Sequence, residues 1–245
     1  MLNHKKIDTK NRKIYQNKDL IKIIYNNYYK KIKKNIYISN KKKILELGSG
    51  GGNIKEVIQK CITSDQFKNQ NIDRIENIYK INFKKSSISN IILIDVFHHL
   101  KFPNLALKEI HRVLIRKGRI IMMEPAMGLI PRFVYKIFHY EPNGFNLKVN
   151  WNHIPKKIPS SNQYFAAQSI PWRAFFLKEL NLRSKYKIKL VEPFSDFGFL
   201  LSGGYSYKAF YPKFLYSLIK LIDKMLTCIS IKIFSARMLI VLEKN

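Results

Sequence analysis

The chain has 245 residues and a mass of 29.0 kDa, enough for one mixed domain with a buried core. Hydrophobic residues make up 46 % and aromatic residues 13 %, which excludes global disorder. No apolar run reaches the roughly 18–20 residues of a membrane-spanning helix, and the first residues lack the apolar core of a signal peptide. Two cysteines, Cys61 and Cys228, are too few for a disulfide framework. We therefore expect a cytoplasmic protein.

The basic charge needs an explanation of its own. With 45 Lys and Arg against 16 Asp and Glu, the formal net charge is +29, which suggests a nucleic acid or an anionic membrane as partner. The basic residues are spread along the chain, and Lys, Ile and Asn are abundant together, as a bias toward AT-rich codons would produce. No NPPY or DPPY tetrapeptide is present. Coding bias is the favoured explanation, nucleic acid is disfavoured, and peripheral membrane contact stays an alternative.

The first predicted elements are a helix, two strands and a glycine turn. Residues 18–34 predict an amphipathic helix whose apolar face carries Ile21, Ile24, Tyr25, Tyr28 and Ile32. A short strand is expected over 44–47, followed by the glycine turn and a helix over 53–60. The next strand, 61–65, ends at Asp65.

The alternation continues in the next part of the chain. Residues 90–100 are nearly all apolar, which predicts a strand buried in a parallel sheet. An amphipathic helix is expected over 105–118, with Gly118 as its C-terminal cap, and a buried strand over 119–125. Strands and helices that alternate over 43–124 predict a doubly wound α/β sheet with right-handed crossovers.

The stretch from 126 to 185 differs from the rest, because it carries five prolines and many aromatic residues. Such a long connection between sheet strands is expected to be functional. Two final strands are predicted at 186–194 and 235–244, with a helix over 212–226 between them. We therefore expect an N-terminal helical segment (1–40), a core with the glycine turn (41–125), a helical cap inserted after the fifth strand (126–185), and C-terminal strands and helix (186–245).

The glycine turn has the composition of a ligand site. Glycines let the backbone approach a ligand closely, and a following helix offers unpaired N–H groups. A dinucleotide fingerprint needs a glycine where Asn53 stands, and a phosphate loop needs a Gly-Lys-Ser/Thr that is absent. What remains is the pattern Glu46-x-Gly48-x-Gly50-x-Gly52.

The run ILELGSGGG resembles the first motif of class I S-adenosylmethionine-dependent methyltransferases. The later run FHHLKFPNLALKEIHRVLIRKGRIIMMEP is similar to later motifs of their small-molecule branch, which includes quinone and sterol C-methylases. This resemblance covers about residues 40–125. It implies a Rossmann-like methyltransferase fold with a mostly parallel, seven-stranded sheet. It also implies S-adenosylmethionine as cofactor and a small-molecule acceptor that is sugar-like, quinone-like or lipid-like.

The resemblance also implies roles for residues at the first two strand ends. Glu46 would organise the methionyl ammonium group of the cofactor. Asp65 would grip both ribose hydroxyls, because a carboxylate offers two acceptor oxygens. The backbone beneath the cofactor would be that of Leu47, Gly48, Ser49 and Gly50.

Further roles follow at the later strand ends. Asn77 stands where the family often has Asp, but its amide oxygen can still accept a hydrogen bond from the adenine amino group. Ile78 would flank the adenine ring, and Asp95 and Val96 would lie beside the methionyl chain. Asn90 replaces an aspartate that usually starts the fourth strand.

The acceptor side is less well defined by the sequence. An oxygen or nitrogen acceptor can need a base that takes its proton, and His139 and Glu124 are the candidate catalytic residues. No metal site is expected from the adjacent His98 and His99, because neighbouring strand residues point to opposite faces. The residues expected near the substrate are Glu124, His139, Tyr140, Glu141 and Trp151.

Two alternatives remain open from the sequence. A degenerate methyltransferase fold could act as a binding or scaffold protein, although the glycine turn with Glu46 and Asp65 favours an enzyme. Residues 210–226 predict a helix with a broad apolar face, which we expect to pack on the sheet. As an interfacial helix on anionic lipid, it would instead favour a lipid or quinone acceptor and a peripheral-membrane lipid methyltransferase.

Overall fold

Seven strands form a single sheet in the order β3-β2-β1-β4-β5-β7-β6. Every neighbouring pair is parallel except the two that include β7. This arrangement confirms the predicted doubly wound, mostly parallel sheet. The strands are β1 (Lys43–Leu47), β2 (Cys61–Asp65), β3 (Arg74–Ile75), β4 (Ile88–Ile94), β5 (Leu114–Pro125), β6 (Tyr186–Ser195) and β7 (Ser235–Lys244).

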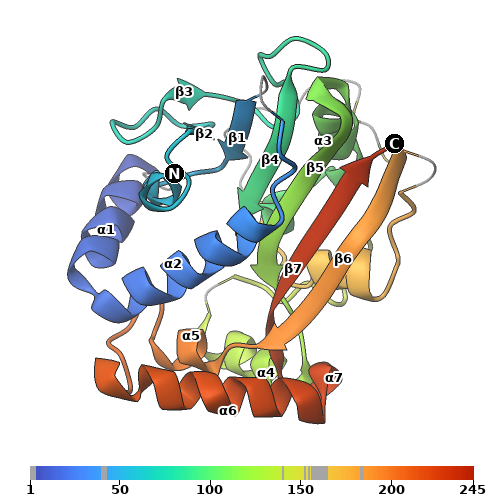
Figure 1. The fold of residues 1–245 in the computed structure, drawn as a ribbon. Coiled ribbons are helices and arrows are strands. Elements are labelled where there is room, and N and C mark those ends of the chain that lie inside the picture. The colour runs from blue at the N-terminus through green and yellow to red at the C-terminus, as the bar shows by residue number, and fades with distance from the viewer. Residues whose placement is uncertain are drawn as a thin grey trace.

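The structure is a computed structural model that describes residues 4–39, 43–139, 141–151, 153, 155, 165–182 and 185–245, with backbone only for 4–8. Figure 1 shows four of its helices, α4 to α7, gathered at the end of the sheet toward which β4 and β5 point. The helices are α1 (His4–Asn17), α2 (Asp19–Lys34), α3 (Pro103–Val113), α4 (Leu129–Phe138), α5 (Phe197–Leu201), α6 (Tyr216–Ile229) and α7 (Ile231–Phe234).

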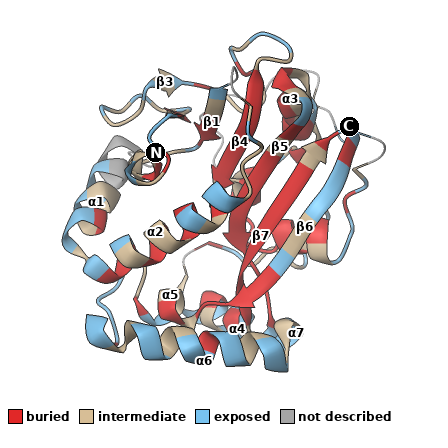
Figure 2. Cartoon of the chain, in the orientation of Figure 1, coloured by how far each residue is buried: buried red, intermediate tan, exposed pale blue. Residues whose placement is uncertain are grey.

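Helix α2 buries the apolar face that its spacing predicts. Ile21, Ile24 and Ile32 are at most 1 % exposed and share an apolar cluster with residues of β5 and β7. A second, larger cluster, to which α3 contributes, packs on other side chains of the same strands. The strands β4, β5 and β7 are therefore buried over most of their length, as Figure 2 shows.

Two predicted elements are shorter than expected. The helix over 53–60 is only a 3₁₀ turn at Asn53–Glu56. The apolar stretch 90–100 is not one strand, because β4 ends at Ile94 and Asp95 adopts a left-handed conformation with φ of 55°. The chain then enters a second 3₁₀ turn, Phe97–His99.

Gly118 does not cap a helix as predicted. Helix α3 ends at Val113 and β5 begins at Leu114, so Gly118 lies within the strand. A Cβ atom there would come within 2.9 Å of the Ile115 carbonyl oxygen and 3.0 Å of the Ser89 carbonyl oxygen. The glycine is needed for this close packing and not for a helix end.

The expected helical cap over 126–185 is helical only in part. Among its described residues, α4 and the π-helical turn Trp172–Phe176 are the helical pieces. Proline removes a backbone donor and interrupts helices, and the prolines of this stretch favour irregular backbone. Ala126, Ile170 and Phe175 are nevertheless buried in the larger core cluster, so part of the stretch is core.

Helix α6 is present, but the prediction that its apolar face packs on the sheet is wrong. Asp223 is the one buried residue of α6, whereas Leu218 and Met225 are 53 % and 58 % exposed. The Asp223 carboxylate holds the helix through hydrogen bonds, whereas the leucines of α6 are exposed or only partly buried. No helix in the described part of the chain is long and apolar enough to cross a bilayer.

Candidate functional site at the carboxyl ends of the strands

The glycine loop connects β1 to the first 3₁₀ turn. Gly48, Gly50 and Gly52 all have positive φ, at 75°, 49° and 68°, a backbone region that favours glycine. A Cβ atom on Gly48 would lie 2.4 Å from a methyl carbon of Val96, so the loop runs directly against that side chain. Leu47 is 2 % exposed and belongs to the larger core cluster.

Glu46 is buried at the end of β1, and one of its carboxylate oxygens lacks a partner. Glu46 is 4 % exposed, and its Oε2 atom has no hydrogen-bond partner among the described residues. Burial raises the pKa of Glu46 to about 7, helped by the nearby Asp65 carboxylate and opposed by the Ser49 hydroxyl. A buried acceptor without a donor is costly, so this atom suits a cationic ligand.

Asp65 lies at the end of β2, as predicted, and holds the glycine loop. The Gly50 N–H donates to Asp65 Oδ2 at 3.0 Å, and the Phe67 N–H donates to Oδ1 at 3.2 Å. The carboxylate stays partly exposed, so its remaining lone pairs can accept from a ligand. Asp73 is different, because it is engaged by Lys55 at 2.6 Å and by the Thr63 backbone at 2.9 Å.

Asn77 and Ile78 follow β3 on the same side of β1 as Asp65. Asn77 Oδ1 accepts a hydrogen bond from the Tyr79 N–H at 2.9 Å, so the amide oxygen expected at adenine also caps a local turn. Ile78 packs, partly buried, against the larger core cluster. Both roles toward adenine stay predictions.

Asp95 pairs with an arginine that the sequence analysis missed. Arg237, at the start of β7, forms a bidentate ion pair with Asp95, and its second contact is 3.2 Å long. The Tyr25 hydroxyl of α2 donates to Asp95 Oδ2 at 3.2 Å. The Arg237 charge outweighs burial and lowers the pKa of Asp95. Arg237 is the one charged residue in the first eight of the final strand, a signal that could have revealed this pair.

Glu124 is fully buried and positions its neighbours. Its Oε1 atom accepts from the Val96 and Phe97 N–H groups at 2.8 and 2.7 Å, and Oε2 lies 2.8 Å from His98 Nδ1. Both oxygens are therefore engaged by the turn after β4. Glu124 is placed at the sheet end as predicted, but its contacts are those of a positioning residue.

A cluster of polar side chains surrounds His98, between Glu124 and Glu141. His98 Nε2 lies 3.6 Å from Glu141 Oε2, and His99 Nε2 lies 3.8 Å from Glu141 Oε1. The Gln168 amide donates a hydrogen bond to Glu141. The two carboxylates outweigh burial and raise the pKa of His98 to about 10, so this imidazole is charged.

His99 and His139 are neutral neighbours of this cluster. His99 Nδ1 lies 3.0 Å from the Phe165 carbonyl oxygen, which can only accept, so Nδ1 carries the proton and Nε2 the lone pair. Burial and the charged His98 lower the pKa of His99 to about 4. The Glu141 N–H donates to His139 Nδ1 at 3.2 Å, which occupies the basic nitrogen of that predicted catalytic residue.

The adjacent histidines do not point to opposite faces of a strand, as the prediction of no metal site requires. His98 and His99 lie on a 3₁₀ turn and not on a strand, and their rings are 4.1 Å apart. His98, His99 and Glu141 offer three ligand atoms within 4.8 Å of one another, and are described residues that could hold a metal ion. Tyr140, also expected near the substrate, lies outside the described residues.

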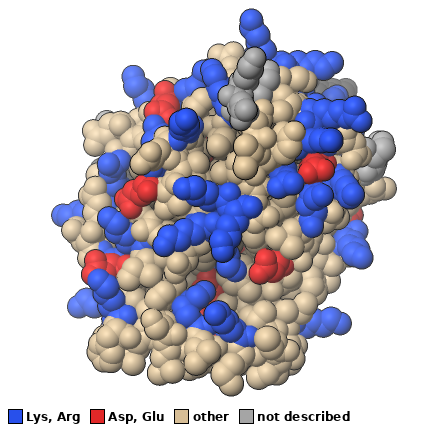
Figure 3. All heavy atoms as spheres, in the orientation of Figure 1, with Lys and Arg blue, Asp and Glu red and all other residues tan. Residues whose placement is uncertain are grey.

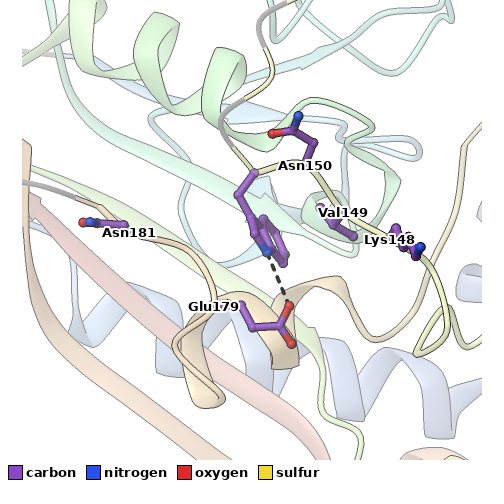
Figure 4. A pocket seen from close by; sticks show the side chains of 6 residues that line it. Lys148, Val149, Asn150, Glu179 and Asn181 are labelled. Carbon is purple, nitrogen blue, oxygen red and sulfur yellow. Dashed lines mark hydrogen bonds between the residues drawn. The ribbon is translucent and has the colours of Figure 1, made fainter.

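Trp151 lines a surface hollow. Glu179 lines the same hollow, which Figure 4 shows from close by. Its indole N–H donates to Glu179 Oε2 at 3.3 Å, and the Arg173 guanidinium lies 5.9 Å from its ring. Lys148 and Asn181 line the same hollow. Trp151 thus contacts Glu179, Arg173 and the larger core cluster, and its place near the acceptor stays a prediction.

Comparison with known proteins finds a methyltransferase domain within the chain. Residues 45–122 match the family model of the methyltransferase domain. The chain is an S-adenosylmethionine-dependent methyltransferase. The matched residues run from β1 into β5 and include Glu46, Asp65 and Asp95, so S-adenosylmethionine is the expected cofactor of this methyltransferase.

Solved structures of methyltransferases share the fold. A S-adenosylmethionine-dependent methyltransferase from Thermotoga maritima, described as a possible histamine N-methyltransferase, has a TM-score of 0.52 at 12 % identity and covers 95 % of this chain and 93 % of its own. Another from Mesorhizobium loti has a TM-score of 0.48 at 12 % identity, covering 88 % and 96 %. No curated protein matches the chain. At such identity the first likeness concerns the fold alone.

Proposed function

We propose that this methyltransferase transfers the methyl group of S-adenosylmethionine to a small-molecule acceptor at the carboxyl ends of β1, β2, β4 and β5. The observation that carries the cofactor site is the buried, unpaired Oε2 atom of Glu46. A ligand ammonium group would supply the missing donor. Ligands of open α/β sheets bind beyond the carboxyl ends of the strands, which is where Glu46 lies.

The residues present fit the cofactor. Glu46 would hold the methionyl ammonium, Asp65 the ribose, and Asn77 with Ile78 the adenine. Gly48 and Gly50 have no side chains and adopt positive φ, so the backbone on either side of Ser49 can approach a ligand closely. When bound, S-adenosylmethionine supplies a methyl group on a sulfonium, which is a strong electrophile. The protein then has to orient an acceptor and exclude water.

The polar cluster around Glu141 would receive the proton of an oxygen or nitrogen acceptor. His99 is neutral, its Nε2 atom carries a lone pair, and that atom faces the Glu141 carboxylate at 3.8 Å. An acceptor hydroxyl could donate to either group. Glu124 would act through His98 as a positioning residue, and His139 would donate from Nε2.

Transfer of a labelled methyl group tests this assignment. Sugars, quinols and lipids with free hydroxyls would be incubated with methyl-labelled S-adenosylmethionine and the wild type, Glu141→Gln or Glu179→Gln. We expect Glu141→Gln to lower the turnover at least about tenfold with unchanged cofactor affinity. Glu179→Gln, in the surface hollow of the same segment, should behave as wild type.

Two results would count against the proposal. Equal turnover in wild type and Glu141→Gln would remove the cluster from the reaction. Cofactor binding without transfer to any acceptor class would favour the scaffold alternative. Acceptors from the quinone and lipid classes are the ones that the next observations favour.

A further inference from the structure

The end of the molecule below the strand ends carries a large apolar surface. Twelve of the twenty exposed large apolar side chains of the described residues belong to α4, α6, α7 and the 3₁₀ turn Lys213–Leu215. We call this surface the basal face. It consists of Leu129, Ile130, Phe133, Ile137, Phe138, Phe214, Leu218, Leu221, Ile222, Met225, Ile229 and Ile233.

The basal face is continuous and belongs to ordered helices. Helix α4 packs beside α7, and α7 packs beside α6. On α6 the exposed side chains recur at helical spacing, as in Leu218, Leu221 and Met225, and form one outward stripe. Figure 2 shows α6 largely exposed, whereas α2, of similar length, is buried on one side.

The inner side of α6 is held by a polar anchor. The Asp223 carboxylate accepts hydrogen bonds from the Ser195 hydroxyl at 2.8 Å and from the Phe197 and Gly198 N–H groups at 2.8 and 3.1 Å. These contacts fix α6 to the end of β6 and the start of α5. The helix is thus fixed in the orientation that turns its leucines outward.

The charged residues of the three helices that form the basal face are basic, apart from one buried aspartate. The helices α4, α6 and α7 contain one acidic residue, Asp223, which is 2 % exposed. Figure 3 shows the lower edge of the molecule mostly free of charged groups, with lysines and arginines next to it. The basic residues of the three helices are Arg132, Lys136, Lys220, Lys224 and Lys232.

These charges decide between the partners that could cover an apolar face. A second copy of this chain would bring lysines against lysines, and the exposed carboxylate beside the face, that of Asp19, is already paired with Lys213 at 2.7 Å. An anionic lipid surface supplies both the apolar phase and the opposite charge. Lysines at the margin of an apolar stripe can reach the lipid headgroups with their charged ends.

We propose that the basal face lies on an anionic membrane, with α6 in the plane of the interface. Three residues separate β5 from helix α4, which ends at Phe138, next to His139 and the Glu141 cluster. The membrane surface therefore adjoins the acceptor side of the strand ends. Resting on the proposed function, this placement makes the acceptor a lipid-phase molecule with a polar reacting group.

Flotation with vesicles tests the docking. The wild type, Leu218→Glu and Ile188→Glu would be mixed with vesicles of phosphatidylcholine alone or with equimolar phosphatidylglycerol, at low and high salt. Ile188 is 46 % exposed on β6, outside the basal face, and serves as a matched control. The wild type and Ile188→Glu should float with the anionic vesicles, less at high salt. Leu218→Glu should bind at least about tenfold more weakly, as expected for one leucine side chain taken from an apolar phase.

The same samples separate the possible failures. A wild type that stays unbound to anionic vesicles, or a Leu218→Glu variant that floats equally well, would overturn the docking. A wild-type dimer that Leu218→Glu dissociates, measured by light scattering without vesicles, would assign the face to a second copy instead. Calorimetry with S-adenosylhomocysteine would be run on each variant. Vesicle binding without cofactor binding would refute the proposed function and leave the docking in place.

Discussion

The cofactor side of this methyltransferase, where α2 covers the sheet, and the basal face both carry amphipathic helices. The apolar residues of the helix are buried on the cofactor side and exposed on the basal face. On the cofactor side, α2 buries Ile24 to 1 % exposure against β5 and β7, and its Tyr25 reaches Asp95. On the basal face, α6 leaves Leu218 53 % exposed and buries Asp223. An apolar stripe in the sequence therefore indicates that a helix face needs an apolar partner. It does not indicate whether that partner is the protein's own sheet or something outside the protein.

The largest expected effect is on cofactor binding. Gly50→Val places a β-branched side chain at φ of 49°, beside the Gly50 N–H that bonds Asp65. Binding of S-adenosylhomocysteine should be lost by calorimetry, whereas Leu218→Glu should retain it. A Gly50→Val protein with wild-type affinity would break the distinction between the two regions, and circular dichroism would check that it is folded.

The next largest effect is on the free energy of unfolding, which should depend on an apolar side chain of α2 but not on one of α6. Ile24→Ala removes a buried side chain and should lower the free energy of unfolding by about 2–5 kcal/mol. Leu218→Ala removes an exposed one and should change it by less than about 0.5 kcal/mol. Urea denaturation of both variants measures the difference. An equal loss in both would mean that α6 packs inside the protein after all.

Loss of the ribose contact should weaken cofactor binding less than the substitution in the glycine loop does. Asp65→Ala should reduce cofactor affinity by about 1.5–3 kcal/mol, the usual contribution of hydrogen bonds to a charged group. Asp65→Asn keeps an acceptor for the Gly50 N–H and should lose less. Asp73→Ala is the matched control, since Asp73 is engaged by Lys55 and Thr63, and its affinity should stay unchanged. If Asp73→Ala loses cofactor affinity and Asp65→Ala does not, the ribose contact belongs to Asp73 and not to Asp65.

The last prediction concerns pH and the charged His98. Its pKa is raised in the folded protein to about 10 from 6.5, so its contribution to stability is complete below pH 6.5 and is lost as the pH rises toward 10. The wild type should therefore lose more stability between pH 7 and 10 than His98→Gln does. The free energy of unfolding of both proteins would be measured by urea denaturation at each pH. An equal loss of stability in the two proteins would mean that His98 is neutral when folded.

The sequence was most informative where local chemistry dictates structure. The strand over 235–244, the acidic end of β2 at Asp65, and the buried face of α2 follow from apolar spacing and turn residues, and all are confirmed. Glu46 lies in the predicted strand directly before the glycine loop, and its role toward the cofactor stays a prediction. Where a segment has a regular helical or strand period, the spacing of its apolar and turn residues is enough to predict the element.

Contacts between distant segments could not be read in this way. The pairing of Asp95 with Arg237 joins residues 142 positions apart, and the turn at Asp95 interrupts a stretch that looks like a continuous strand. The same holds for Asp223, whose burial depends on the end of β6. Tertiary hydrogen bonds, and not apolar periodicity, decided these positions.

The central claim is that Glu46 holds the ammonium group of S-adenosylmethionine, and a pH-dependent calorimetric titration tests it most directly. Wild-type protein should bind the cofactor more tightly at pH 7.5 than at pH 6, because the pKa of Glu46 is raised to about 7 and the carboxylate is protonated at the lower pH. Glu46→Gln should bind about 10- to 100-fold more weakly at pH 7.5 and show no such increase. Glu46→Gln with wild-type affinity at both pH values would contradict the account.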